Sequence, residues 1–112
     1  MKKIEAVIRP ERMEAVMEEL RMLGYPGVTL TEVRGHGKQK GVGHIWRGTE
    51  YRVEFLPKIK LEVVVGDDDS QKVTDAVVRA ARTGSIGDGK LFIYDLVDVV
   101  KVRTGESGPE AL

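Results

Sequence analysis

The sequence has no cysteine, no net charge and no long hydrophobic run, and each absence excludes a class of protein. Without cysteine, its 112 residues hold neither a disulfide framework nor a thiolate metal site. Basic and acidic residues number 18 each, so the chain lacks the positive excess that general nucleic-acid binding requires. No apolar run approaches the length of a membrane span.

What is present fits one ordinary folded domain. Hydrophobic residues make up 41% of the chain and charged residues 32%, a balance typical of neither disordered nor membrane-embedded proteins. The segment that begins at Met1 turns acidic at Glu5 before any apolar stretch develops, so no signal peptide is predicted. We therefore expect a single domain over residues 1–112, located in the cytoplasm.

The spacing of apolar residues predicts a succession of strands and helices. Strands are predicted over residues 2–9, 28–34 and 58–65, from residue 90, and briefly over 99–103, and helical spacing is found over residues 13–23 and 73–80. The main order is β-α-β-β-α-β, which is the α+β, ferredoxin-like arrangement.

Particular residues are expected to end or start these elements. Pro10 should stop the first strand, and Gly24 should end the first helix. Residues 51–56 either continue the loop or form strand-like flanks, and Pro57 should break this segment before the strand at 58–65. The acidic residues 67–69 and Ser70 come before the second helix, at its positive end, and supply a plausible N-cap.

Two helices cover only one face of a four-stranded sheet. Residues 63–65 and 91–94 are nevertheless continuously apolar, as expected of strands that are covered on both faces. A domain of this size buries a limited core, and oligomerisation is a common supplement. The sequence therefore predicts that a partner covers the open face.

Between residues 35 and 48, five glycines are interleaved with cationic side chains and no hydrophobic period exists. This predicts a long mobile loop, which in a compact domain is usually functional or disordered. Gln39, Lys40 and Lys58, in or beside this loop, either meet a carboxylate ligand or are simply polar residues of a mobile segment. Tyr51 is either a packed flank of the loop or exposed for modification.

Residues 83–90 are rich in glycine and end in a lysine. Gly84 to Lys90 satisfies G-x-x-x-x-G-K, but Leu91 stands where a Walker loop needs Ser or Thr, and the segment leaves a helix to enter a strand. A P-loop NTPase is therefore excluded. Closely spaced glycines still allow main-chain N–H groups to converge on an anion. The alternative is a flexible connection between helix and strand.

Lys101 and Arg103 flank one residue of the last predicted strand and are expected on the same face of it. They fit either a polyphosphate clamp beside the glycine-rich segment or a solvated strand edge. No Ser/His/Asp set, H-E-x-x-H motif or recognisable catalytic carboxylate pair is present, and His36 and His44 are too isolated to define a metal site. We therefore expect a protein that is not an enzyme.

Several segments, in order and without a shift in spacing, resemble the PII signal-transduction proteins over nearly the whole chain. They are MKKIEA (1–6), TLTEVRG (29–35), QKG (39–41), Tyr51 with FLPK (55–58), ARTG (81–84) with GDGK (87–90), and RTGE (103–106). The resemblance implies a homotrimer of ferredoxin-like subunits whose sheets face inward, with ATP or ADP between neighbours. It implies a nitrogen and energy-status signalling protein with at most a weak ATPase activity.

The resemblance also assigns site residues by position. Nucleotide contacts fall on Thr29, Gly37, Lys38, Gln39, Glu62, Val64, Gly87, Asp88, Gly89, Lys90, Lys101 and Arg103. Contacts to 2-oxoglutarate fall on Gln39, Lys40, Gly41, Lys58 and Gly87, and Gln39 would help hold Mg²⁺ together with ATP and 2-oxoglutarate. Lys38 and Lys101 stand where the family usually has Arg, so the bidentate fork toward phosphate is absent there.

Residues of about 36–56 resemble the family's T-loop, and residues of about 82–90 would form its nucleotide loop. The T-loop would change shape with ligand and dock into an ammonium transporter or into an enzyme or regulator of nitrogen metabolism, so that a membrane is reached only through a channel partner. Tyr51 matches the tyrosine that is uridylylated in many bacterial members. The loop tip, residues 42–46, departs from the commonest family pattern.

Three alternatives fit the sequence less well. A ferredoxin-like RNA-binding module needs aromatic residues on its central strands, but residues 58–65 have none. An acylphosphatase-like hydrolase on the same fold lacks an evident catalytic base. A PII-like relative that senses another ligand competes most closely, but the set of Gln39, Lys58 and Gly87 favours 2-oxoglutarate.

Overall fold

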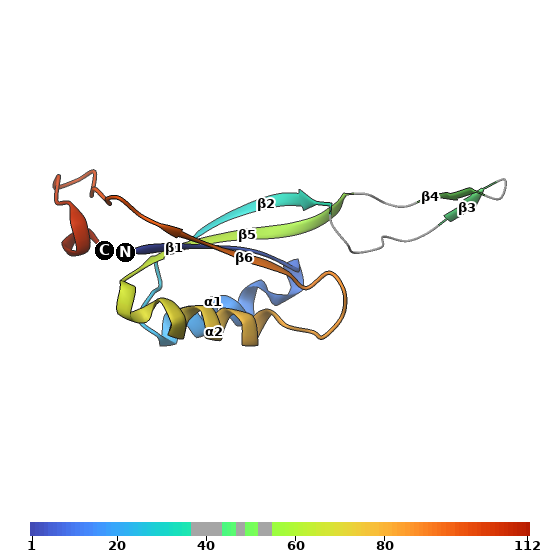
Figure 1. Ribbon diagram of the computed structural model, residues 1–112, viewed down its shortest axis with the longest axis horizontal. Helices are drawn as coiled ribbons and strands as arrows, with labels where there is room; N and C mark the ends of the chain where they lie inside the picture. Colours follow the sequence, from blue (N-terminus) through green and yellow to red (C-terminus); the bar gives the residue numbers. More distant parts are fainter. Residues whose placement is uncertain (37–43, 47–48, 52–54) are drawn as a thin grey trace.

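The computed structural model describes residues 1–36, 44–46, 49–51 and 55–112 of the chain. A four-stranded antiparallel sheet lies on two helices (Figure 1). The sheet contains β1 (Lys2–Ile8), β2 (Thr29–Gly35), β5 (Leu56–Val65) and β6 (Gly89–Asp95) in the order β2-β5-β1-β6, and the helices are α1 (Met13–Met22) and α2 (Ser70–Ala81). The predicted ferredoxin-like α+β arrangement is confirmed.

Shorter elements complete the chain. The part of the chain that the structure describes also contains the 3-10 helices η1 (Pro10–Arg12), η2 (Asp67–Asp69) and η3 (Gly108–Ala111). Most of the predicted mobile loop lies outside the described residues. The sequence predicted no regular structure over residues 35–48, but β3 (His44–Trp46) lies within this range and pairs as an antiparallel ribbon with β4 (Thr49–Tyr51), which follows it.

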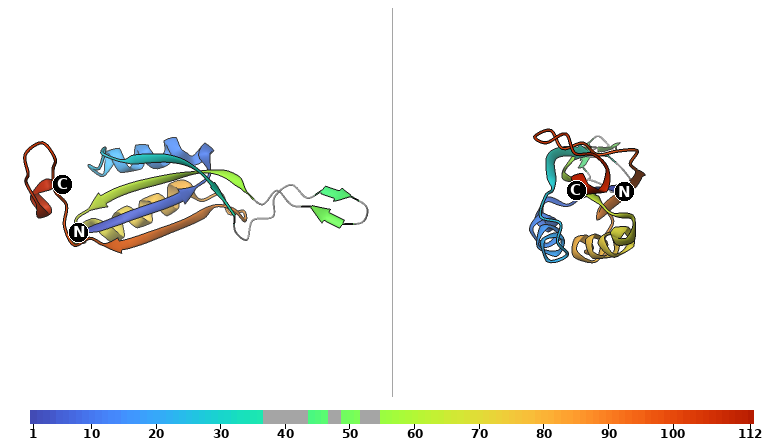
Figure 2. Two further views of the ribbon diagram at one scale, coloured as in Figure 1. Left: turned by 90° about the horizontal axis from the view of Figure 1, so that it is seen from above. Right: turned by 90° about the vertical axis from the view of Figure 1, so that its left-hand side faces the viewer.

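The core lies between the sheet and the helices, because the apolar residues of each element gather on one face. Alternate residues of β1 and β5 are fully buried or nearly so, and they meet the apolar stripes of both helices: Ile4, Ala6, Ile8, Leu61, Val63, Val65, Val16, Leu20, Val73 and Val77. Burial of each large aliphatic side chain contributes about 1.5–3 kcal/mol to stability. Both helices lie on the same side of the sheet (Figure 2, right), so the core covers only one face of the sheet.

The sequence predicted that Pro57 breaks the chain just before a strand that starts at Lys58, and this prediction is wrong. Pro57 lies inside β5, where it faces Arg34 of β2. The register of β1 with β5 ends at Ile59, so at residue 57 the strand has a single neighbour. Proline is tolerated at such an edge position because only one side of the strand needs its N–H groups.

The predicted N-cap of the second helix is also wrong. Asp69 occupies the cap position, but its backbone is helical (φ −95°, ψ −10°) and its side chain makes no capping hydrogen bond. Because α2 continues directly from η2, the backbone never adopts the extended conformation that aims a capping side chain back at the helix. Instead the Asp69 carboxylate accepts a hydrogen bond from the Tyr25 hydroxyl and pairs with Lys72 at 3.3 Å.

The predicted strand over residues 99–103 does not form. Only Val100 is bridged, to Ser107, and the chain between them turns back on itself through Gly105, whose φ is +74°. Lys101 N–H donates to the Glu106 carbonyl at 2.8 Å, and Gly105 N–H donates to the Lys101 carbonyl at 2.8 Å. Since no described strand lies beside this segment, it pairs locally. The expectation that Lys101 and Arg103 share a strand face is therefore wrong.

The helix-free face of the sheet remains open in the single chain. On β6, Phe92 and Tyr94 point to this face, opposite Glu5 and Lys3 of β1, and each is 45% exposed although it is aromatic. Elsewhere on this face, Lys3 pairs with Glu62 at 2.9 Å. In the described part of the chain, neither helix is long and apolar enough to cross a membrane.

Candidate functional site

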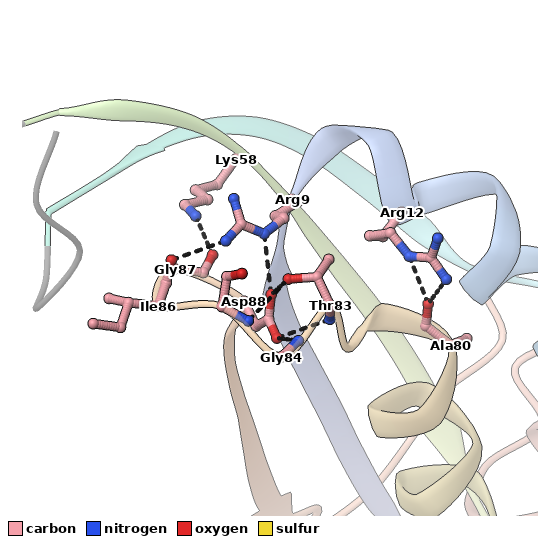
Figure 3. A network of polar contacts seen from close by, with 10 residues as sticks. Arg9, Arg12, Lys58, Ala80, Thr83, Gly84, Ile86, Gly87 and Asp88 are labelled. Carbon is pink, nitrogen blue, oxygen red and sulfur yellow. Dashed lines mark hydrogen bonds and ion pairs between the residues drawn. The ribbon is translucent and has the colours of Figure 1, made fainter. Parts of the chain in front are cut away.

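The loop between α2 and β6 is organised by the side chain of Asp88 (Figure 3). The main-chain N–H groups of Thr83 and Gly84 both donate to its Oδ2 at 2.8 Å, and the Thr83 hydroxyl donates to its Oδ1. Ser85 N–H donates in turn to the Thr83 hydroxyl oxygen at 3.2 Å. One carboxylate thus closes the turn, so residues 83–88 form a hydrogen-bonded loop rather than a flexible connection.

Gly89 is required by a close approach of two strands. Its φ is +100°, and a Cβ at this position would lie 1.8 Å from the carbonyl oxygen of Val7 on β1. Only glycine combines this backbone conformation with the absence of a side chain. The position where the loop enters β6 is therefore fixed against β1.

Two cations reach the loop from other elements. Arg9, between β1 and η1, places Nε 3.1 Å from Asp88 Oδ1 and donates from Nη2 to the Ile86 carbonyl at 2.9 Å. Lys58 of β5 donates from Nζ to the Gly87 carbonyl at 2.6 Å. The loop is therefore held both by its own aspartate and by two cationic side chains distant in sequence.

The pKa values of two side chains in the site, Asp88 and Lys58, are shifted from their usual values. The hydrogen bond from the Thr83 hydroxyl, followed by those from the Thr83 and Gly84 N–H groups and from Arg9, holds the pKa of Asp88 well below its usual range against the opposing effect of burial. Lys58 is only 9% exposed, and burial, followed by the charge of Arg9, lowers its pKa. A buried ammonium is suited to bind an anion.

The depressed pKa of Asp88 predicts a pH dependence of stability. Since the folded-state pKa lies below the usual value of about 4, the ionised carboxylate stabilises the fold above that pH, and the contribution is lost as pH falls toward the folded-state pKa. Melting temperatures of the natural chain and of Asp88→Asn should differ by a constant amount from pH 7 to about 5 and converge below about pH 4. A gap that persists unchanged at lower pH would rule out this role of the carboxylate.

Three predicted nucleotide contacts lie together on another part of the sheet. Thr29 of β2 faces Glu62 of β5 in the register, and Val64 is two residues further along β5 on the same face. Glu62 is engaged by Lys3, whose hydrogen bond lowers the Glu62 pKa. Lys90 is placed on β6 opposite Val7, at the end of the strand next to the loop.

The single chain does not bring Lys101 and Arg103 to the glycine loop. Both follow β6, whereas the loop precedes it, and the strand from Gly89 to Asp95 spans about 20 Å. Figure 1 places the C-terminal segment and the α2–β6 loop at opposite ends of the sheet. The predicted phosphate clamp is therefore not assembled within one chain.

The remaining predicted site residues are less defined. Gly37, Lys38, Gln39, Lys40 and Gly41 lie outside the described residues, so the predicted magnesium contact of Gln39 does too. The backbone of Tyr51 lies in β4, paired with His44. In the described ranges, no group of three His, Asp or Glu side chains is placed to hold a metal ion.

Sequence reasoning missed Arg9 and the loop role of Thr83. An aspartate in a glycine-rich turn commonly accepts nearby N–H groups, so Asp88 itself signals that the loop closes on residues such as Thr83. Arg9 gives no such signal, because the residue with which it pairs is 79 positions away in the chain.

Comparison with known proteins identifies the family of the chain. The family model for nitrogen regulatory protein P-II matches residues 1–106. The chain belongs to the P-II family. It is 50% identical to nitrogen regulatory protein P-II of Bradyrhizobium diazoefficiens, 49% to that of Pasteurella multocida and 48% to nitrogen regulatory protein P-II 1 of Escherichia coli K12, each over 100% of both chains. The predicted family is confirmed, and this P-II chain is a nitrogen regulatory protein from a family of regulators.

Proposed function

We propose that this P-II chain senses nitrogen and energy status as a homotrimer. ATP or ADP would bind in each cleft between subunits, 2-oxoglutarate and Mg²⁺ would join ATP there, and the T-loop would carry the signal to a partner. The partner would be an ammonium transporter or an enzyme or regulator of nitrogen metabolism in the cytoplasm. Uridylylation of Tyr51 belongs to the same proposal.

The separation of the two phosphate-binding regions carries this proposal. The nucleotide loop ends at Gly89, and Lys101 and Arg103 lie beyond the far end of β6, about 20 Å of strand away. A second copy of the chain, with its C-terminal segment beside the loop of the first, would unite them. Closed rotational symmetry would then repeat the same cleft around the axis.

The open sheet face supports association through the same surface. Phe92 and Tyr94 on this face are about half exposed in the single chain, and burying aromatic area of this kind drives the formation of oligomers. If the open faces meet at a common axis, Thr29, Glu62 and Val64 come to lie near the neighbouring chain. They would then line the nucleotide cleft as the family pattern assigns.

The second ligand is supported by the cation beside the loop. Lys58 is buried, and its ammonium lies 2.6 Å from the Gly87 carbonyl oxygen. A carboxylate group of this ligand would therefore meet a buried cation. Gln39, Lys40 and Gly41 would complete this site, and Gln39 would link it to Mg²⁺ and ATP. Binding would be regulatory, with ATP hydrolysis at most weak.

Calorimetric titration tests this function directly. We expect 2-oxoglutarate to bind in the presence of Mg-ATP and not in its absence, because Mg-ATP would complete its site. We expect light scattering to give about 37 kDa, three times the chain mass of 12.4 kDa. Binding of ATP without any effect of 2-oxoglutarate would leave an adenylate sensor and refute the role of Lys58. A monomer that binds neither ligand would refute the whole proposal.

A further inference from the structure

Arg9 joins the two features that shape the nucleotide loop. Its side chain is 17% exposed, and its guanidinium contacts the Asp88 carboxylate from Nε and the Ile86 carbonyl from Nη2 (Figure 3). Asp88 holds the start of the loop through Thr83 and Gly84. Arg9 therefore fixes the main chain at residue 86 and the carboxylate that closes the turn at the same time.

The contact with the Ile86 carbonyl sets the direction of a neighbouring N–H group. None of the described peptide bonds is cis, and in a trans peptide the C=O of one residue points opposite to the N–H of the next. With the Ile86 carbonyl turned toward Arg9, the N–H of Gly87 points away from Arg9. Lys58 acts in the same way on the next peptide, turning the N–H of Asp88 away through the Gly87 carbonyl.

The conformation of Gly87 lets both peptides face the same way. Its φ is +103°. In an extended chain, by contrast, successive carbonyl groups point in opposite directions. Both carbonyls are instead held by cations, and two successive N–H groups face the other side. Consecutive N–H groups in this arrangement form an anion-binding concavity.

We propose that Arg9 is a positioning residue for nucleotide phosphate. This proposal rests on the proposed function, since the anion is taken to be the polyphosphate of ATP. Arg9 does not touch the ligand in this account. It acts through the Ile86 carbonyl and Asp88, so that the N–H groups of Gly87 and Asp88 are aimed at phosphate oxygens before ATP arrives.

Arg12 provides a matched control. Arg12 is the last residue of η1, the 3-10 helix that begins directly after Arg9. Its Nε and Nη2 donate to the Ala80 carbonyl at 2.9 and 2.6 Å. Its guanidinium thus ties the same N-terminal turn to the end of α2. Within the described part of the chain, its hydrogen bonds go to Ala80 and none goes to residues 83–90, so its removal loses contacts with α2 without releasing the loop.

The test compares ATP with adenosine, which has the base and ribose but no phosphate. Arg9→Met should weaken ATP binding about tenfold while adenosine binding changes less than about twofold. Arg12→Met should leave both affinities within about twofold. Arg9→Lys, which keeps the charge but lacks the fork that reaches two groups, should give an intermediate loss for ATP alone, and it serves if the Met variant fails to fold.

The possible outcomes separate the two proposals. Unchanged ATP affinity in both Arg9 variants would overturn the positioning role, as would equal losses for ATP and adenosine or an equal loss of ATP in Arg12→Met. A natural chain that binds no ATP would overturn the proposed function together with this inference.

Discussion

Replacement of Gly89 by alanine should destabilise the folded chain by at least about 3 kcal/mol. The new Cβ would lie 1.8 Å from the Val7 carbonyl oxygen, and the main-chain φ of +100° is itself unfavourable for alanine. Neither β1 nor β6 can move away easily, because β1 is paired on both edges, to β5 and β6, in the middle of the sheet. The free energy of unfolding, measured by denaturant titration, checks this expectation.

Gly84→Ala separates the clash from the backbone strain. Gly84 has a similar φ of +93°, but an added Cβ would meet no atom within 4 Å. Its replacement should therefore cost only the conformational strain, about 1–2 kcal/mol. Equal destabilisation by the two substitutions would contradict the close approach of Gly89 to Val7.

Replacement of Lys58 by methionine should lower the affinity for 2-oxoglutarate by about 100-fold and the affinity for ATP by no more than about tenfold. The reason is that Lys58 is the buried cation of the proposed dicarboxylate site, whereas it would act on ATP only indirectly, through the Gly87 carbonyl that orients the N–H group of Asp88. Methionine has a similar length and removes the cost of burying a charge, so stability should stay within about 1 kcal/mol. Titration of 2-oxoglutarate in saturating Mg-ATP measures the effect.

Lys72→Met is the control for a general loss of positive charge. Lys72 lies exposed near the start of α2, where it pairs with Asp69 at 3.3 Å, and the loop begins only after the other end of the helix. It should not alter either affinity. A similar loss of 2-oxoglutarate binding in both variants, or equal losses of both ligands in Lys58→Met, would refute the assignment of Lys58.

Local patterns were sufficient to predict the order of the main elements. The alternation in β1 and the helical spacing in α1 report which side chains are buried, and both elements formed as expected. The errors arose where a neighbour decides the outcome. Pro57 is accepted in β5 because β1 ends before it, and the segment after Val99 folds back because no described strand lies beside it.

The candidate site was predictable only in part, for a similar reason. Glycine spacing and Lys90 indicated an anion-binding loop, and a resemblance to the family identified the other positions. Arg9 could not be found in this way, because its contacts with Ile86 and Asp88 join residues nearly 80 positions apart. The placement of Arg103 far from the loop follows from the path of β6, which no local pattern reports.

The central claim is that nucleotide binds between two copies of the chain, with the loop from one and the C-terminal cations from the next. Lys90→Glu and Arg103→Glu, made in separate chains with different affinity tags, should each abolish ATP binding in their own trimers. Trimers that contain both chains, isolated through both tags, each have one cleft with a natural Lys90 and a natural Arg103.

We expect calorimetry to find about one ATP bound per mixed trimer and none in either parent. Binding in the mixed trimers would show that the two residues act from different chains. Mixed trimers that bind no ATP, like their parents, would contradict the composite site and place Lys90 and Arg103 in a site made by a single chain.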